Sequence, residues 1–294
     1  MNRFTPLCLV LLWLGGCAAQ MSRPAPSAEA NAPAIAPDDS LYATLWQQAS
    51  LEHDLVYAEV YRDAQSKLPR ALRDPRWDAL PHPERAAVRH GSLRGLKPAI
   101  ILDIDETVLD NSPQQARQIK RGAQAFDPAA FDAWVAEAAA QPLPGALALT
   151  KFAAAHGIRV FYISNRDQDM AGATLANLRK AGFPVFGDGA FLGLGMKVEG
   201  CTPQHGSKGC RRELVARKYR VLMEFGDQIG DFLDLAANTP DGRREAMEPY
   251  RDWIGERWFV LPNPVYGSWL NALDDGAKTP DAKRAAEHAA LATQ

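Results

Sequence analysis

The sequence predicts an α/β fold built on a doubly wound parallel sheet, with an additional region that is mainly helical. Three apolar runs, at residues 98–103, 159–164 and 220–225, have the composition and length of buried strands. Segments with helical periodicity separate them, and strands that alternate with helices are typical of parallel sheets. Each run ends in polar residues, and ligands of such sheets bind beyond the carboxyl ends of the strands.

Helices are predicted before and between these strands. Ordered structure is expected to begin near residue 38 with a long helical segment to about residue 68. Its apolar and aromatic stripe, which includes Leu45, Leu55 and Tyr61, is typical of packing. Further helices are predicted at 83–90, 128–141, 144–156, 168–181, 211–219 and 280–294, and short strands at 191–192 and 258–261.

The first 37 residues are predicted to lie outside the folded domain. Arg3 and the apolar run at 7–14 have the form of a secretory signal over residues 1–16, and the run is too short to span a membrane. Leu14-Gly15-Gly16-Cys17 resembles the bacterial lipobox, which implies cleavage before Cys17, lipidation of this cysteine and an outer-membrane location. An ordinary secreted protein is the alternative. Residues 17–37, rich in alanine and proline, are predicted to be a disordered tether.

Cys201 and Cys210 remain in the predicted mature protein. Disulfides persist in an exported, oxidising compartment, so the two cysteines are expected to form one. His205 lies between them, so a small metal site is the alternative, although structural zinc normally takes four ligands.

Charge and motif content argue against several other classes of protein. The formal net charge of −2 gives no sign of the basic surface that binds a nucleic-acid polymer. The chain also has no P-loop and no glycine-rich dinucleotide fingerprint.

Carboxylates gather at the predicted carboxyl edge of the sheet. Asp103 and Asp105 follow the first run, and Asp227 and Asp231 follow the third. Parallel strands end at the same edge, so these side chains are expected to meet. Carboxylates this close repel one another unless a cation compensates, and oxygen ligands favour Mg²⁺.

Groups suited to binding a phosphate lie near the same edge. Ser164, Asn165 and Arg166 end the second run, and Arg166 is expected to bind either a phosphate or a carboxylate. Lys208 is the first candidate for a lysine that stabilises a transferring phosphoryl group, and Lys197 is the second. A carboxylate nucleophile, a proton-transferring carboxylic acid and a cation together suit phosphoryl transfer.

Several motifs, in order along the chain, resemble those of a known family. Asp103-Ile-Asp-Glu-Thr-Val-Leu-Asp-Asn-Ser-Pro113 resembles the first motif of the haloacid dehalogenase (HAD) superfamily, and its extended form is similar to the class C nonspecific acid phosphatases, which are bacterial outer-membrane lipoproteins. The resemblance spans about residues 40–275. It continues in Gln141–Gly145, Val160–Arg166, Lys208-x-x-Arg211, Gly226–Phe232 and Leu261–Trp269.

The resemblance implies a HAD-like Rossmannoid core within residues 38–294, with helical cap contributions from about 38–90 and 112–142. It implies an Mg²⁺-dependent acid phosphatase for phosphomonoesters, often nucleoside 5′-monophosphates, and a homodimer. Asp103 would be the nucleophile and a metal ligand. Asp105 would be the general acid and base, and would bind the metal through its backbone carbonyl.

The resemblance also implies roles for the remaining site residues. Asp227 and Asp231 would be metal ligands, the latter directly or through a water. The phosphoryl oxygens would be bound by Ser164, Asn165 and Lys208. The substrate base would lie between aromatic side chains, for which the candidates are Trp134, Tyr266 and Trp269, with simple packing as the alternative.

Three features depart from the family pattern. Gln114 stands where an aromatic residue often follows Asn-Ser-Pro, Gln228 replaces the usual asparagine, and residues 199–207 look like an insertion before the lysine. Gln114 motivates an alternative function, a phosphatase for sugar phosphates or other small metabolites. A second alternative is a low-turnover binding lipoprotein on the same fold.

Overall fold

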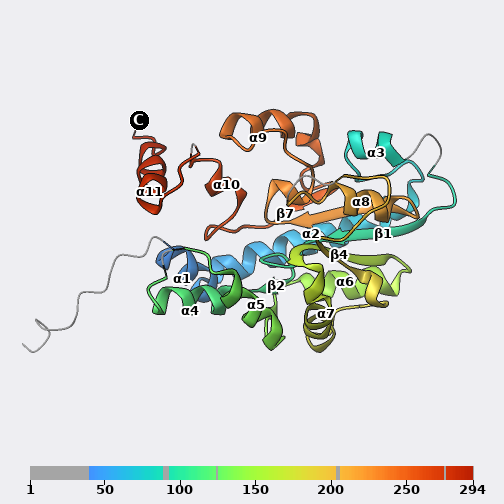
Figure 1. Ribbon diagram of the computed structural model, residues 1–294. Helices are drawn as coiled ribbons and strands as arrows, with labels where there is room; N and C mark the ends of the chain where they lie inside the picture. Colours follow the sequence, from blue (N-terminus) through green and yellow to red (C-terminus); the bar gives the residue numbers. More distant parts are fainter. Residues whose placement is uncertain (1–39, 89–92, 124, 203–205, 275, 294) are drawn as a thin grey trace, which may run out of the picture. The chain divides into compact units, whose positions relative to one another are not determined.

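The fold is organised around a parallel sheet. The computed structural model describes residues 40–88, 93–123, 125–202, 206–274 and 276–293. Within these residues, five parallel strands form a sheet in the order β5-β4-β1-β6-β7 (Figure 1). The strands are β1 (Lys97–Leu102), β4 (Arg159–Asp167), β5 (Phe191–Leu194), β6 (Tyr219–Gly226) and β7 (Trp258–Val260). The predicted α/β fold with a parallel sheet is therefore confirmed.

The central strand β1 is buried on both faces. Ile100 and Leu102 pack into one hydrophobic core, and Ala99 and Ile101 pack into the other. Successive side chains of a strand point to opposite faces, so a continuous apolar run fits only a strand that is covered on both sides. The apolar run of the sequence therefore places β1 in the middle of the sheet.

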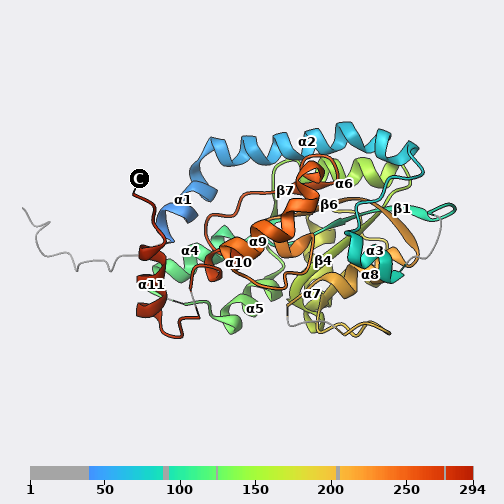
Figure 2. The ribbon, with the colours of Figure 1, turned by 90° about the horizontal axis from the view of Figure 1, so that it is seen from above.

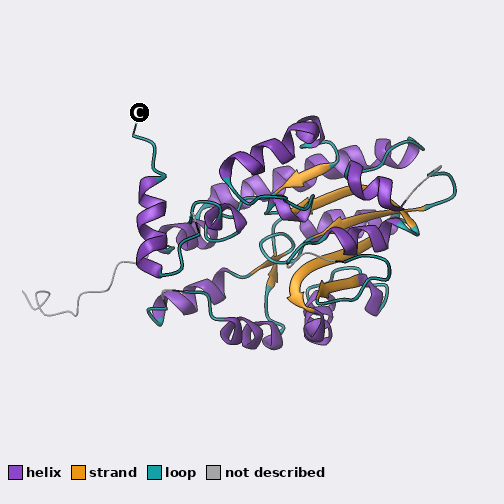
Figure 3. Ribbon diagram, turned by 45° about the horizontal axis from the view of Figure 1, so that its top comes forward, coloured by secondary structure: helices purple, strands orange, loops and turns teal. Residues whose placement is uncertain are grey.

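Helices cover both faces of the sheet (Figure 3). One core receives side chains from α2 (Leu51–Arg73), α6 (Ala146–Ala155) and α7 (Ala171–Lys180). The opposite core receives side chains from α8 (Gly209–Ala216) and from the 3₁₀ helix η5 (Glu248–Trp253). α3 (His82–Val88) packs against α8.

The predicted N-terminal helix is in fact two helices, which meet at an angle (Figure 2). α1 (Leu41–Ala49) ends before Ser50, whose extended backbone interrupts the helix and whose side chain caps α2. The packing prediction is right for Tyr61, which is buried. It is wrong for Leu45 and Leu55, whose side chains are exposed.

Other elements differ from the sequence-based prediction in extent. β4 continues through Asp167, beyond the predicted end of the strand at residue 164. Helices also form in stretches without a clear pattern. These are α4 (Ser112–Lys120), α9 (Pro240–Met247) and α10 (Ser268–Asn271). The predicted helices at 128–141 and 280–294 are shorter than expected, as α5 (Pro128–Glu137) and α11 (Pro280–Ala289).

A small two-stranded sheet begins within the first motif. β2 (Leu109–Asp110) pairs antiparallel with β3 (Gln141–Pro142), which explains why the predicted helix stops before Gln141. None of the helices in the described ranges combines the length and apolar character that crossing a bilayer requires. The predicted signal, Cys17 and tether lie outside the described residues.

Candidate active site

Three of the predicted carboxylates meet at the carboxyl edge of the sheet. Asp103 follows β1, Asp227 follows β6, and Asp231 lies in the short 3₁₀ helix η4 (Ile229–Asp231). One oxygen from each side chain lies within 4.8 Å of the others. Gly226 makes this possible, because a Cβ atom at that position would overlap the Asp231 side chain.

The positive charge of Lys208 does not fully compensate the negative charges of the buried carboxylates in this cluster. Burial, together with Asp231 and Asp105, raises the pKa of Asp103 to about 7 against the opposing effect of Lys208. Burial and the charges of Asp231 and Asp103 also raise the pKa of Asp227 well above its usual range. Three carboxylates that supply only oxygen donors fit a hard divalent cation.

Lys208 lies inside this cluster. Its Nζ contacts Asp103 Oδ1 and donates to Asp231 Oδ1 at 2.6 Å. Burial alone would lower the pKa of Lys208, but the two carboxylates outweigh it and the pKa is raised, so the lysine stays charged. Lys197, the second candidate, is exposed. The geometry therefore favours Lys208 as the lysine of the site.

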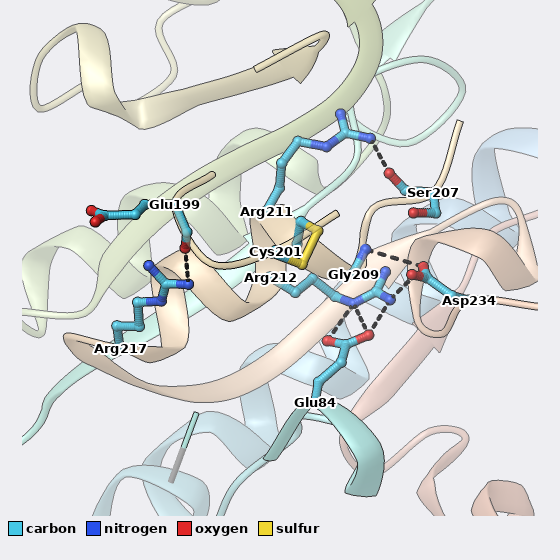
Figure 4. Close-up of a disulfide and its surroundings, with 10 residues drawn as sticks. Glu84, Glu199, Cys201, Ser207, Gly209, Arg211, Arg212, Arg217 and Asp234 are labelled. Carbon is cyan, nitrogen blue, oxygen red and sulfur yellow. Dashed lines mark hydrogen bonds and ion pairs between the residues drawn. A yellow bond between two sulfur atoms is a disulfide. The ribbon is translucent and has the colours of Figure 1, made fainter. Parts of the chain in front are cut away.

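A disulfide and Arg211 hold the segment around Lys208 in place. Figure 4 shows the disulfide and the hydrogen bond from Arg211 to Ser207. A disulfide joins Cys201 to Cys210, which lies in the first turn of α8. Arg211 donates to the carbonyl oxygens of Ser164 at 2.5 Å and Ser207 at 2.8 Å, and so links α8 to the end of β4. The alternative metal site needs His205, which lies outside the described residues.

Asp105 is bound by Arg166. Arg166 Nε and Nη2 donate to Asp105 Oδ1 at 3.0 and 2.7 Å, and Asn111 Nδ2 donates to the same oxygen at 2.7 Å. Burial pulls the pKa of Asp105 upward, but Arg166, Asn111 and Ser164 outweigh it and the pKa is lowered. Of the two partners expected for Arg166, the structure therefore contains the carboxylate.

The side chains of Ser164 and Asn165, which are neighbours in β4, bind different parts of the molecule. Ser164 is buried and its Oγ donates to Asp105 Oδ2 at 3.2 Å. Asn165 is exposed, donates to the carbonyl oxygen of Gly206 at 2.9 Å and accepts from Arg211 at 2.7 Å. The structure thus brings Ser164 to the carboxylates, whereas the Asn165 amide is bound to the segment that precedes α8.

Two tyrosines of α2 hold the loop that follows Asp103. The hydroxyl of Tyr57 donates to the carbonyl oxygen of Glu106 at 2.6 Å, and that of Tyr61 donates to the carbonyl oxygen of Thr107 at 2.5 Å. Glu106 has a φ of 53°, which is rare for a residue with a side chain, so these contacts stabilise a strained turn. The sequence signal was a pair of aromatics four residues apart on a helix, which indicated only packing.

The three aromatic candidates differ in exposure. Trp134 is 4% exposed and its Nε1 donates to Asn111 Oδ1 at 2.7 Å, so it presents little surface on which a substrate base could stack. Tyr266 and Trp269 are half-buried. Trp269 lines an open groove of about 420 Å³, together with Arg243, Arg244, Arg251 and other residues.

The structure shows where two of the residues that depart from the family pattern lie. Gln114 is buried in α4, so it is not an exposed residue that a substrate would meet directly. Gln228 Nε2 donates to Asp227 Oδ2 at 2.7 Å, which links this residue to the carboxylate cluster.

Solved structures resemble this chain over most of its length. The class C acid phosphatase from Bacillus anthracis superposes with a TM-score of 0.71 at 32% identity, covering 87% of this chain and 97% of that one. The same enzyme with tungstate bound gives a TM-score of 0.72 at 33% identity.

Curated relatives match over a shorter stretch. Acid phosphatase 1 of Solanum lycopersicum is 29% identical over 166 residues, and a stem 28 kDa glycoprotein of Glycine max is 30% identical over 173 residues. These matches cover 56% and 58% of this chain, and 57% and 60% of the two plant proteins, less than two thirds of their length.

The family comparison covers most of the described chain. Residues 36–269 match the family described as HAD superfamily, subfamily IIIB (acid phosphatase). Together with the structural similarity, this match confirms the resemblance drawn from the motifs and the HAD-like character of the core. The chain belongs to the subfamily IIIB acid phosphatases of the HAD superfamily.

Proposed function

We propose that this protein is an Mg²⁺-dependent acid phosphatase that hydrolyses phosphomonoesters through an aspartyl-phosphate intermediate. The observation that carries the proposal is the cluster of Asp103, Asp227 and Asp231, with Lys208 in contact with two of them. Family membership supports the class of reaction, phosphoric monoester hydrolysis. The tungstate bound to the bacterial relative is a tetrahedral oxyanion, as phosphate is, which supports the class of ligand.

In the first step, a carboxylate oxygen of Asp103 forms a bond to phosphorus while the bond from phosphorus to the ester oxygen breaks. Lys208 Nζ and Ser164 Oγ donate to the phosphoryl oxygens. Asp105 gives its proton to the leaving oxygen, and the alcohol departs. A divalent cation bound by Asp103, Asp227 and Asp231 would supply further positive charge near the phosphoryl group. The same charge would favour the ionised form of Asp103, whose pKa burial otherwise raises to about 7.

In the second step, a water molecule attacks phosphorus and the bond to Asp103 breaks. Asp105, now a carboxylate, takes a proton from that water, and inorganic phosphate leaves. Both carboxyl groups then return to their starting protonation states. Because Arg166 lowers the pKa of Asp105, an acidic medium favours the protonated form that the first step requires.

Replacing Arg166 with methionine is expected to shift the alkaline limb of the pH profile of kcat/KM to higher pH. Burial of Asp105 would persist without its cation, so the pKa of Asp105 would rise and the proton donor would survive to higher pH. We expect a shift of at least about one pH unit in kcat/KM for an alkyl phosphate, whose leaving oxygen needs a proton.

The variant Arg166→Lys is the matched control for this change. It keeps a positive charge beside Asp105, so its alkaline limb is expected to stay close to that of the wild type. An unchanged limb in Arg166→Met would contradict the assignment of Asp105 as the proton donor.

The proposed substrates are nucleoside 5′-monophosphates. Trp269 supports this choice, because its Nε1 donates to the carbonyl oxygen of Asn263 at 3.2 Å, and Asn263 itself donates to Asp227. An indole thus lies two hydrogen bonds from the metal-binding carboxylates, beside an open groove. The burial of Trp134 favours the alternative of sugar phosphates, because it removes one stacking candidate.

A matched pair of substrates decides between these alternatives. Adenosine 5′-monophosphate and ribose 5-phosphate differ only in the base, and we expect kcat/KM to be about 10-fold higher for the nucleotide if its base stacks on an aromatic side chain. Equal values would favour the sugar-phosphate alternative. Removal of metal by a chelator should abolish both activities, and added Mg²⁺ should restore them. Absence of phosphate release from every monoester would overturn the proposed function.

We also propose that the mature protein is a homodimer anchored to the outer membrane through lipidated Cys17. Only the sequence supports this proposal, through the lipobox and the family resemblance. Detection of acyl chains on the amino-terminal peptide by mass spectrometry tests the anchor, and sedimentation of the purified protein tests the dimer.

A further inference from the structure

Two neutral side-chain amides hold one oxygen of Asp227. Gln228 Nε2 donates to Asp227 Oδ2 at 2.7 Å, and Asn263 Nδ2 donates to the same oxygen at 2.9 Å. Within the described ranges of the chain, no hydrogen bond reaches Asp227 Oδ1. The two oxygens therefore differ: Oδ2 is occupied by donors, and Oδ1 is the oxygen available to a cation.

The loop after β7 fixes the orientation of both amides. Asn263 Oδ1 accepts from the backbone N–H groups of Val265 and Tyr266 at 3.0 and 3.3 Å. Gln228 Oε1 accepts from the backbone N–H of Ser268 at 3.0 Å and from its hydroxyl at 3.2 Å. Since each carbonyl oxygen faces these donors, each NH₂ group faces Asp227.

Glycine at position 267 permits this arrangement. Gly267 has a φ of 143°, which residues with a side chain rarely adopt, and a Cβ atom there would overlap the Gln228 amide. The backbone thus approaches the glutamine closely. We use the term amide clamp for Gln228, Asn263 and the loop 263–268 that orients them.

The chemistry of the donors distinguishes Asp227 from the other carboxylates of the cluster. Asp103 and Asp231 each contact the Lys208 ammonium, which neutralises charge as well as orienting the oxygen. An amide orients a carboxylate without bringing a positive charge, so less charge is cancelled at Asp227 than at Asp103 or Asp231. Partners of this kind commonly orient metal ligands and tune metal affinity.

We propose that the amide clamp positions Asp227 so that Oδ1 is its metal-binding oxygen, which makes Gln228 and Asn263 positioning residues for the divalent cation. The inference rests on the proposed function, since it concerns the metal site of that reaction. It also gives Gln228, the departure from the usual asparagine, a specific task.

Calorimetric titration of the metal-free, full-length protein with Mg²⁺ tests the clamp without any measurement of activity. Gln228→Met and Asn263→Leu keep side-chain size but remove the amide, and each is expected to weaken Mg²⁺ binding about 10-fold to 100-fold. A separate assay should show that kcat recovers toward the wild-type value at saturating Mg²⁺. Recovery is not expected of a variant that is merely misfolded.

Asn238→Ala is the matched control. Asn238 donates to the carbonyl oxygen of Ser268 in the same loop at 2.9 Å and accepts from Arg243, but it does not contact Asp227. Its removal is expected to leave Mg²⁺ affinity close to that of the wild type. Gly267→Ala retains all of the polar groups, but its Cβ atom and its strained backbone displace the glutamine, so it should weaken Mg²⁺ binding as Gln228→Met does.

The possible outcomes separate the clamp from the proposed function. Wild-type affinity in Gln228→Met, Asn263→Leu and Gly267→Ala, together with normal Mg²⁺ binding by the wild type, would overturn the clamp alone. Equal weakening in Asn238→Ala would also overturn it, because the effect would then belong to the loop in general. Failure of the wild type to bind Mg²⁺ would overturn the proposed metal dependence and the clamp together.

Discussion

Replacing Asp103 with asparagine is expected to lower kcat for phosphomonoester hydrolysis by at least about 10³-fold. The amide has the shape of the carboxylate, but it is not a nucleophile and cannot form the acyl phosphate. Hydrolysis of p-nitrophenyl phosphate measures the rate, and acid quenching of a labelled substrate measures the phosphoenzyme. Both signals should disappear in the variant.

The same variant is expected to fold at least as well as the wild type. Burial raises the pKa of Asp103 to about 7, so the folded state disfavours the ionised form of this group. Its contribution to the free energy of unfolding therefore falls as the pH rises from the pKa of an aspartate in the unfolded chain toward 7. Asparagine is neutral and removes that cost, so Tm at neutral pH should stay level or rise.

An exposed carboxylate provides the control for this experiment. Asp188→Asn changes a side chain that is 96% exposed, and it should alter neither activity nor Tm. Retention of wild-type kcat by Asp103→Asn would exclude Asp103 as the nucleophile.

Replacing Arg212 with methionine is expected to destabilise the protein by about 3–5 kcal/mol. Arg212 is fully buried, and its Nε donates to both carboxylate oxygens of Glu84 (Figure 4). Its Nη1 donates to the carbonyl oxygen of Asp231 at 2.9 Å. Loss of the guanidinium leaves Glu84 buried without its cation and removes a support of the turn that carries Asp231. The loss in free energy of unfolding can be measured by urea denaturation, and an unchanged m-value would show that only stability has changed.

The pH dependence of that loss follows from Glu84. Burial raises the pKa of Glu84, while Arg212 lowers it, so the pKa should rise further in the variant. A raised pKa in the folded state favours stability at low pH and costs stability as pH increases. The destabilisation should therefore be larger at neutral than at acidic pH.

Two further variants make the Arg212 experiment decisive. Arg244→Met breaks an ion pair whose partners are 67% and 84% exposed, and it should cost less than about 1 kcal/mol. Glu84→Leu combined with Arg212→Met should recover part of the stability, because the carboxylate of Glu84 is then no longer buried without its cation. Equal losses for Arg212→Met and Arg244→Met would contradict the buried-pair argument.

The sequence predicted the sheet and the edge where the site forms. The apolar runs that became β1, β4 and β6 are long enough to be recognised, and strands of a parallel sheet place their carboxyl ends together. That rule sufficed to predict the meeting of Asp103 with Asp227 and Asp231. Helix ends were less accurate, because caps such as Ser50 and pairings such as β2 with β3 depend on local hydrogen bonds.

The sequence could not predict which side chains form hydrogen bonds between segments that are remote along the chain. Residues such as Tyr57 and Asn263 lie far from Asp103 and Asp227 along the chain, and no spacing rule relates them. Arg166 had two plausible partners, and only the path of β4 through residue 167 decided that it contacts Asp105. Trp134 had the composition of a stacking residue, but packing buried it.

By itself, the sequence determined the fold class, the order of the motifs and the identity of the acidic groups, because these depend on local pattern and on the parallel-sheet rule. Tertiary structure alone decided which oxygen of each carboxylate is engaged, which lysine joins the cluster and which residues orient Asp227. Those choices depend on distances of a few ångströms between segments remote in the chain. Hydrogen bonds and buried ion pairs are sensitive to such distances, whereas residue pattern is not.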